Sequence, residues 1–149
     1  MNRRGFTIIE LMTVIVIIGI LATISTLRYI DLRDEATAAK ISSEIEAVRL
    51  AAYNYWADHE SFPPDAAAGV KPPELVDYTR GALHFTNSDY TLDWDSFPGG
   101  GGAYRVGLTI TADNTHLQNT VIKMFGEKAP FFRNGSSLTY IIVGPDGQM

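Results

Sequence analysis

The sequence of 149 residues contains no cysteine and has only 12 basic residues against 17 acidic ones. Without cysteine there is no disulfide, no thiolate ligand for zinc and no cysteine nucleophile. The formal net charge of −5 offers no basic face to phosphate groups, so nucleic acid is not expected as the main partner. The length suits one modest domain, with or without an appendage.

One long apolar run stands near the start of the chain. The 17 residues from Leu11 to Leu27 carry no charge, and a span of roughly 20 apolar residues crosses a bilayer as a helix. Arg3 and Arg4 precede the run, and the positive-inside rule places such an end in the cytoplasm. The mean hydropathy of +0.01 therefore averages an apolar segment with a polar, acidic remainder, which we expect on the other side of the membrane.

Three simple interpretations of this run compete: a secretory signal, a plain single-pass anchor and a buried core helix. A secretory signal ends in small residues at a cleavage site, which Leu27-Arg28-Tyr29-Ile30 does not provide. None of the three explains Glu10, because an ionisable side chain costs on the order of 2–3 kcal/mol at the centre of a bilayer and less near its edge. Glu10 is therefore a candidate functional residue, with snorkelling to the interface as the alternative.

The segment Arg3-Arg4-Gly5-Phe6-Thr7-Ile8-Ile9-Glu10-Leu11-Met12, continued by the apolar residues 14–22, resembles the N-terminal signal of type IV pilins and pseudopilins. The resemblance implies that a prepilin peptidase cuts between Gly5 and Phe6 on the cytoplasmic side. It also implies that the new amino group of Phe6 is N-methylated. In this family the glutamate that matches Glu10 is required for efficient assembly and often for methylation.

Elementary electrostatics agrees with these roles. A cationic amine on Phe6 and the carboxylate of Glu10 attract strongly in a helix bundle of low dielectric constant, and each is costly there if left alone. We therefore expect Glu10 of one subunit to pair with the Phe6 amine of a neighbour and to set the axial register. Many family members carry a proline where this chain has Leu27, and its absence predicts a straighter helix at this point.

The helix is predicted to continue beyond the membrane, since residues 28–58 contain no proline or glycine. Apolar residues recur there at spacings of 3 and 4, as on one face of an amphipathic helix: Ile41, Ile45, Val48, Ala52 and Tyr55. Phe62-Pro63-Pro64 ends the pattern, so the predicted helix runs from Phe6 to Asp58. The aromatic residues near its end, Tyr53, Tyr55 and Trp56, are predicted to anchor a core.

Residues 59–149 are predicted to form a head of the α+β class. Alternating apolar and polar residues predict strands at 90–95 and 104–111, joined as an antiparallel hairpin across the glycine run 99–102. A short helical turn is expected at 74–78, a helix from Thr115 to Phe125 that ends at Gly126, and a last strand at 138–143. The expected head is a three- or four-stranded antiparallel sheet packed on the long helix.

Motifs for catalysis or metal binding are weak in this sequence. The glycine run lacks the Lys-Ser/Thr of a phosphate-binding loop, and three isolated histidines, His59, His84 and His116, have no zinc-site spacing. Asp93 and Asp95 lie on one strand face, which we interpret as solvated. Calcium is the alternative, because major pseudopilins of similar size bind it near the C-terminus, but their extended C-terminal aspartate pattern is not found in this sequence. We expect no catalytic residue, no metal ligand and no cofactor.

These observations divide the chain into a leader (1–5), a membrane or filament-core helix (6–28), its amphipathic continuation (29–58) and the head (59–149). The predicted protein is a non-enzymatic structural subunit of a type IV pilus or a type II secretion pseudopilus. The resemblance implies other pilin subunits, a prepilin peptidase and methylase, an inner-membrane assembly platform and membrane lipid as partners, with the head in the periplasm before assembly. Alternatives are a membrane-anchored periplasmic binding module that never polymerises and a tethered periplasmic enzyme.

Overall fold

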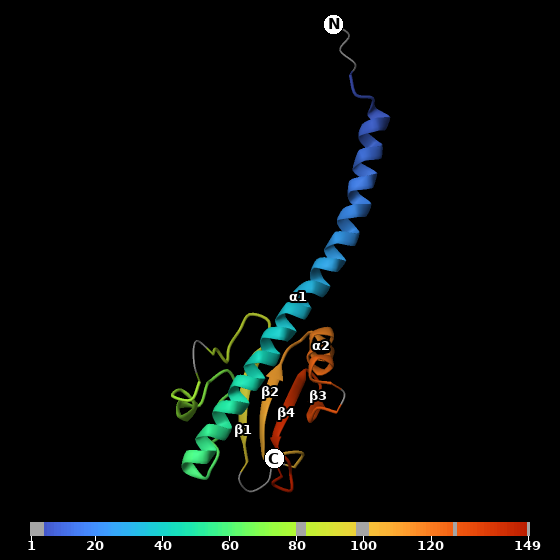
Figure 1. The fold of residues 1–149 in the computed structure, drawn as a ribbon. Helices are drawn as coiled ribbons and strands as arrows, with labels where there is room; N and C mark the ends of the chain where they lie inside the picture. The colour runs from blue at the N-terminus through green and yellow to red at the C-terminus, as the bar shows by residue number, and fades with distance from the viewer. Residues whose placement is uncertain (1–4, 80–82, 98–101, 127, 149) are drawn as a thin grey trace.

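The structure is a computed structural model that describes residues 5–79, 83–97, 102–126 and 128–148. Its first element is the helix α1 (Ile8–His59) of 52 residues, which is about 80 Å long at 1.5 Å per residue. The N-terminal half of α1 projects away from the head, and the C-terminal half lies along it (Figure 1). The expected helix is confirmed, with each end displaced by one or two residues.

Both ends of α1 have a local cause. Thr7 caps the first turn through its side chain, and Glu60 closes the last turn in the left-handed conformation (φ 53°), donating its backbone N–H to the carbonyl of Trp56. Between these ends α1 runs without interruption past Leu27, and Figure 1 shows a gentle curve with no sharp kink. This agrees with the straighter helix predicted from the absence of proline at Leu27, because sharp kinks need a proline or another defined interruption.

The head contains one antiparallel sheet of four strands in the order β1-β2-β4-β3. Its elements beyond α1 are η1 (Pro73–Leu75), β1 (Thr91–Ser96), β2 (Val106–Thr111), α2 (Thr115–Phe125), β3 (Phe131–Asn134) and β4 (Ser137–Val143). The pairing of β1 with β2 is confirmed, although 98–101 of the expected hairpin tip lies outside the described residues. The sequence did not predict β3, which joins β4 through the two-residue turn Gly135-Ser136.

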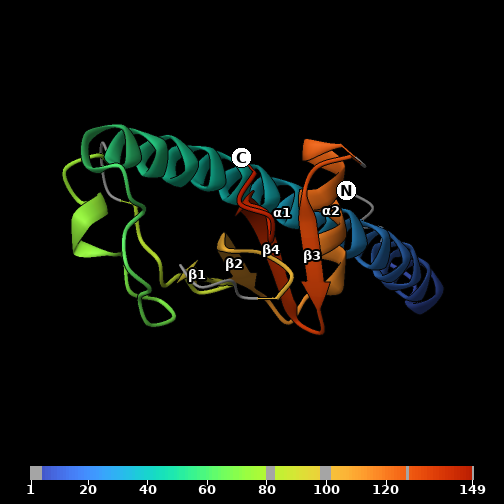
Figure 2. The same ribbon diagram turned by 90° about the horizontal axis from the view of Figure 1, so that it is seen from below.

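The C-terminal half of α1 and the helix α2 cover one face of the sheet (Figure 2). Between the layers, the predicted stripe residues Ile41, Ile45, Val48 and Ala52 are fully buried. Their neighbours in the core come from the sheet and from α2: Leu92, Trp94, Leu108, Leu138, Leu117 and Val121. Burial of each large apolar side chain contributes about 1.5–3 kcal/mol relative to exposure, so this layer holds the head on α1.

The aromatic residues near the end of α1 differ in their roles. Tyr53 and Tyr55 are partly buried and pack against the core, as predicted. Trp56 is 38% exposed, so the prediction of a core anchor is wrong for this residue. It lies on the helix surface, where its ring stacks on Phe62 with the centroids 6.4 Å apart.

The segment between α1 and β1 fastens onto the outer edge of β1. Ala66 and Gly69 donate their backbone N–H groups to the carbonyls of Trp94 and Leu92, at 3.2 and 2.8 Å. The indole N–H of Trp94 donates to the carbonyl of Pro63 at 3.2 Å. These bonds occupy an edge that would otherwise offer free backbone groups to another chain.

Candidate assembly site at the amino terminus

The N-terminal half of α1 packs against no other part of the chain among the described residues. Its large apolar residues from Phe6 to Ile30 are between 47 and 81% exposed. The helix contains a window with a mean hydropathy of 2.5, none of it buried, and by length and composition it is able to cross a membrane. Such a surface needs lipid or other apolar helices around it.

The threonine side chains within the helical part of this half are satisfied by the helix itself. Three threonine hydroxyls donate to the carbonyl four residues earlier, each at 2.9 Å: Thr13 to Ile9, Thr23 to Gly19 and Thr26 to Ala22. Unpaired polar groups are expensive in an apolar surrounding, and these bonds remove that cost. The surface of α1 is therefore suited to lipid or to close helix packing despite its threonines.

Glu10 is the one ionisable side chain between the start of α1 and Leu27, and it forms a capping box with Thr7. The Glu10 carboxylate accepts from the backbone N–H and from the hydroxyl of Thr7, both at 2.9 Å. The Thr7 oxygen in turn accepts from the backbone N–H of Glu10 at 3.2 Å. Reciprocal bonds of this kind satisfy two N–H groups that the helix cannot satisfy itself.

The sequence analysis missed Thr7, although the Thr-x-x-Glu spacing of a capping box is readable without a structure. The capping box also sets the direction of the Glu10 side chain. It turns the Glu10 carboxylate back toward the start of the helix, where the chain passes through Phe6. A negative charge at a helix N-terminus also interacts favourably with the helix dipole.

The Gly5–Phe6 bond stands immediately before this box. Both residues are exposed and outside the helix, and a Cβ on Gly5 would meet no atom within 4 Å. Proteases act on accessible chain that is not held in a helix, so the bond has the surroundings that cleavage needs. Arg3 and Arg4, the predicted basic residues of the leader, lie outside the described residues.

The interpretation of Asp93 and Asp95 as a solvated strand face is wrong. Asp95 accepts from the hydroxyl of Tyr104 at 2.9 Å, and one carboxylate oxygen of Asp93 is buried without a hydrogen-bond partner in the described structure. Burial, with repulsion from Asp95 and Asp65, raises the pKa of Asp93 to about 6. The chain before β1 and the ring of Tyr104 cover this face, which the alternating sequence pattern does not reveal.

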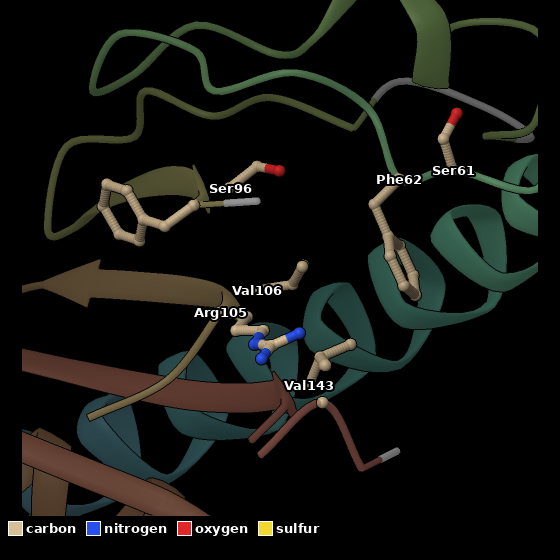
Figure 3. A pocket seen from close by; sticks show the side chains of 8 residues that line it. Ser61, Phe62, Ser96, Arg105, Val106 and Val143 are labelled. Atoms are coloured by element: carbon tan, nitrogen blue, oxygen red, sulfur yellow. The ribbon is translucent and has the colours of Figure 1, made fainter. Parts of the chain in front are cut away.

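One pocket of about 290 Å³ lies where the ends of β1, β2 and β4 approach the chain that follows α1. Figure 3 shows Arg105 pointing into it between Phe62 and Val143. Its lining contains one cation and no carboxylate, histidine or cysteine: Ser61, Phe62, Ser96, Phe97, Arg105, Val106, Val143 and Gly147. Acid–base catalysis needs a group that titrates near the working pH, and this lining offers none.

The isolated histidines do not assemble a metal site either. Within residues 5–79, 83–97, 102–126 and 128–148, no three histidine or carboxylate side chains are grouped so as to hold a metal ion. His59 stacks on Tyr55 with the ring centroids 4.2 Å apart. Among the described residues, the clearest need for a partner is therefore that of the exposed apolar half of α1.

Comparisons with known proteins also draw attention to the N-terminal region of the chain. Residues 1–26 match the family model described as the prokaryotic N-terminal methylation motif. The type IV major fimbrial protein FimA of Dichelobacter nodosus is 30% identical over 138 residues, which cover 93% of this chain and 81% of that protein. No solved structure matches the chain.

Other relatives share mainly the N-terminal region. The type IV narrow pilus major component PilA5 of Thermus thermophilus is 51% identical over 51 residues, which cover 34% of this chain and 44% of that protein. The type II secretion system core protein G of Escherichia coli is 38% identical over 86 residues, covering 53% of this chain and 59% of that protein. In both cases the match spans less than two thirds of the relative's own length.

Proposed function

The chain belongs to the family of type IV pilins and pseudopilins, and from that premise we propose that it is a membrane-held precursor that polymerises through α1. The observation that carries this proposal is the exposed apolar half of α1. Near its start, the carboxylate of Glu10 accepts a hydrogen bond from the backbone of Thr7. Before assembly this half lies in the inner membrane with the head in the periplasm. In the filament it packs against the same half of other copies.

Processing at the amino terminus precedes assembly in this proposal. A prepilin peptidase cuts between Gly5 and Phe6, which removes Arg3 and Arg4 and leaves a cationic amine on Phe6. Methylation of that amine keeps its positive charge. The amine then pairs with Glu10 of a neighbouring copy, because neither charge is stable alone among apolar helices.

The subunit itself catalyses nothing in this account. The peptidase, the methylase and the assembly platform are its partners, and the product is a surface pilus or a shorter pseudopilus. Similarity to PilA5 and FimA supports the first product, and similarity to the type II core protein G supports the second. The choice between them rests on the other components with which the chain is expressed.

Mass spectrometry of the membrane and sheared-fibre fractions tests this proposal. We expect a chain that begins with N-methylated Phe6 in both fractions, and Gly5→Val should leave a longer chain confined to membranes. Gly19→Ala is the matched control, since a Cβ there meets no atom within 4 Å. An intact Met1 in wild-type protein, or cleavage near Thr26, would contradict the proposed processing. Processed chain that never enters fibres would instead favour an anchored binding module.

A further inference from the structure

We propose that the heads of neighbouring copies contact each other through two opposite flanks of unlike charge. The acidic flank is the segment 58–79 beside β1, and the basic flank is formed by α2, β3 and the described residues between them, 126 and 128–130. This inference rests on the proposed filament and deepens it, since it names a second contact besides the packing of α1. The partner at each flank is another copy of this chain.

The acidic flank combines negative charge with exposed apolar side chains. Residues 58–79 contain five acidic residues and one basic residue. Four of the carboxylates are exposed, and they are Asp58, Glu60, Asp65 and Asp77. Val70 and Val76 on the same segment are 52 and 50% exposed. Protein contacts commonly bury apolar side chains within a polar rim.

The basic flank also combines charge with exposed apolar side chains, but its charge is positive. Residues 115–134 contain three basic residues and one acidic residue, although the whole chain is acidic. Lys123, Lys128 and Arg133 are all exposed. Met124 and Phe132 on this flank are 46 and 41% exposed. The two flanks are therefore complementary in charge, and both carry apolar side chains to bury.

The fold places these flanks at opposite ends of the head. The chain from Pro63 to Gly69 is bound to the free edge of β1, whereas β3 forms the other edge of the sheet. Figures 1 and 2 both show the green segment after α1 on one side and the orange α2 and β3 on the other. A copy placed at one flank therefore presents its own free flank to the next copy.

This arrangement makes a heterologous contact, which extends without limit unless its rotation closes a ring. The contact therefore suits a filament and does not suit a closed two-fold dimer. The three ion pairs within the described residues involve other side chains: Arg33–Asp89, Lys40–Glu44 and Arg49–Glu46. Within the part of the chain that the structure describes, the flank charges are thus not consumed by internal ion pairs.

Cysteine cross-linking tests the contact directly, because the natural chain has no cysteine. We expect filaments of Val76→Cys/Phe132→Cys to give a ladder of covalent multimers after oxidation, which reduction collapses. Each single variant should give monomer only, because like flanks do not meet. Leu32→Cys/Phe132→Cys is the matched control, since Leu32 is exposed on α1 and belongs to neither flank.

The outcomes separate this inference from the proposed function. Filaments of the double variant without a ladder would overturn the flank contact and leave the filament itself intact. Wild-type chain that forms no filaments would overturn the proposed function, and the flank contact with it. A ladder in the Leu32 control as strong as in the test variant would also overturn the contact, because it would show unspecific pairing.

Charge reversal with rescue provides a second, independent test. Lys128→Glu/Arg133→Glu should lower the yield of sheared filaments by about tenfold, since like charges at an interface suppress association. Adding Glu60→Lys/Asp77→Lys should restore the yield, because the pairing is then reversed and not lost. Thermal unfolding of each variant shows that the head is folded. Unchanged yield in the first variant, or no rescue in the second, would overturn the contact.

Discussion

The carboxylate of Glu10 accepts two hydrogen bonds from Thr7, one from its backbone N–H and one from its hydroxyl, both at 2.9 Å. Both donors reach the same oxygen, Oε2. A carboxylate has about four acceptor sites, so the second oxygen is able to take a further donor. Glu10 can therefore cap its own helix and still receive the amine of a neighbouring Phe6.

Glu10→Gln separates the capping role from the charge. A glutamine at this place preserves a capping box, but it cannot neutralise a cationic amine. We expect Glu10→Gln to reduce the filament fraction almost as much as Glu10→Ala, by about tenfold or more, since an unpaired buried charge costs several kcal/mol. Sheared-fibre yield, normalised to subunit in the membrane, measures the effect. Near-normal assembly of Glu10→Gln would show that capping alone is the function.

Thr7→Val is the matching change on the other side of this pair. It removes both hydroxyl bonds but keeps the backbone N–H that Glu10 accepts from. The loss of a helix cap costs about 0.5–2 kcal/mol, so assembly should fall less than in the Glu10 variants. An equal loss in both would assign the role to the capping box as a unit.

The sequence predicted α1, β1, β2, α2 and β4 because each has a periodic apolar pattern with a clear end. The helix α2 matched the expected bounds residue for residue, since Asn114 and Gly126 mark its ends. The strand β3 was missed because three of its four residues are exposed, which leaves no alternation to read. The dipeptide Gly135-Ser136, a hairpin-turn signal with glycine at the first central position, was nevertheless present.

The environment of Asp93 could not be predicted from its neighbours in sequence. Its raised pKa depends in part on the charge of Asp65, 28 positions earlier, in a segment that binds the edge of β1. Such contacts arise from tertiary packing and leave no local pattern. The assembly site, in contrast, could be predicted from the sequence, because its residues lie close together in the chain: Gly5, Phe6, Thr7 and Glu10.

Asp93 makes stability depend on pH. Its pKa is raised from 3.8 to about 6, first by burial and then by Asp95 and Asp65. The folded head therefore binds this proton more tightly than the unfolded chain, so stability falls as pH rises from about 4 to about 6. We expect Asp93→Asn to have a higher Tm than wild type at pH 7.5 and a smaller difference in the same direction at pH 4.5, where only part of this loss has occurred. Circular dichroism of the solubilised chain measures both.

Asp77→Asn is the control for this pH series, since Asp77 is exposed on the same side of the head. It removes the same charge but should leave the Tm difference between the two pH values unchanged. If Asp93→Asn lowers the Tm at pH 7.5, the ionised carboxylate stabilises the head, and the direction given for its pKa is wrong.

Asn114 joins two helices, and its replacement by aspartate tests that link. Its side-chain oxygen accepts from the backbone N–H groups of His116 and Leu117, while its amide donates to Asp34 at 2.8 Å. Aspartate caps helices as well as asparagine does, but here it would face a second carboxylate. We therefore expect Asn114→Asp to destabilise the head by about 1–3 kcal/mol, since a buried acceptor loses its donor.

Asn114→Asp/Asp34→Asn restores the pair with its polarity reversed, so its stability should return toward wild type. Urea unfolding in detergent at pH 7 compares the three chains. If the double variant is no more stable than Asn114→Asp, the contact between α1 and α2 does not depend on this hydrogen bond.

Gly107 marks a place where the sheet admits no side chain. A Cβ there would lie 2.7 Å from Cγ2 of Thr139 and 2.9 Å from a ring carbon of Tyr104. Gly107→Ala should therefore cost about 1–3 kcal/mol, as overpacking does. Thr139→Ser removes the methyl group but keeps the hydroxyl that bonds to Thr109 at 2.7 Å. We expect the double variant to recover part of the loss, because the contact with Tyr104 remains. A thermal unfolding cycle of the four chains measures this coupling, and strict additivity of the two changes would show that Thr139 does not crowd this position.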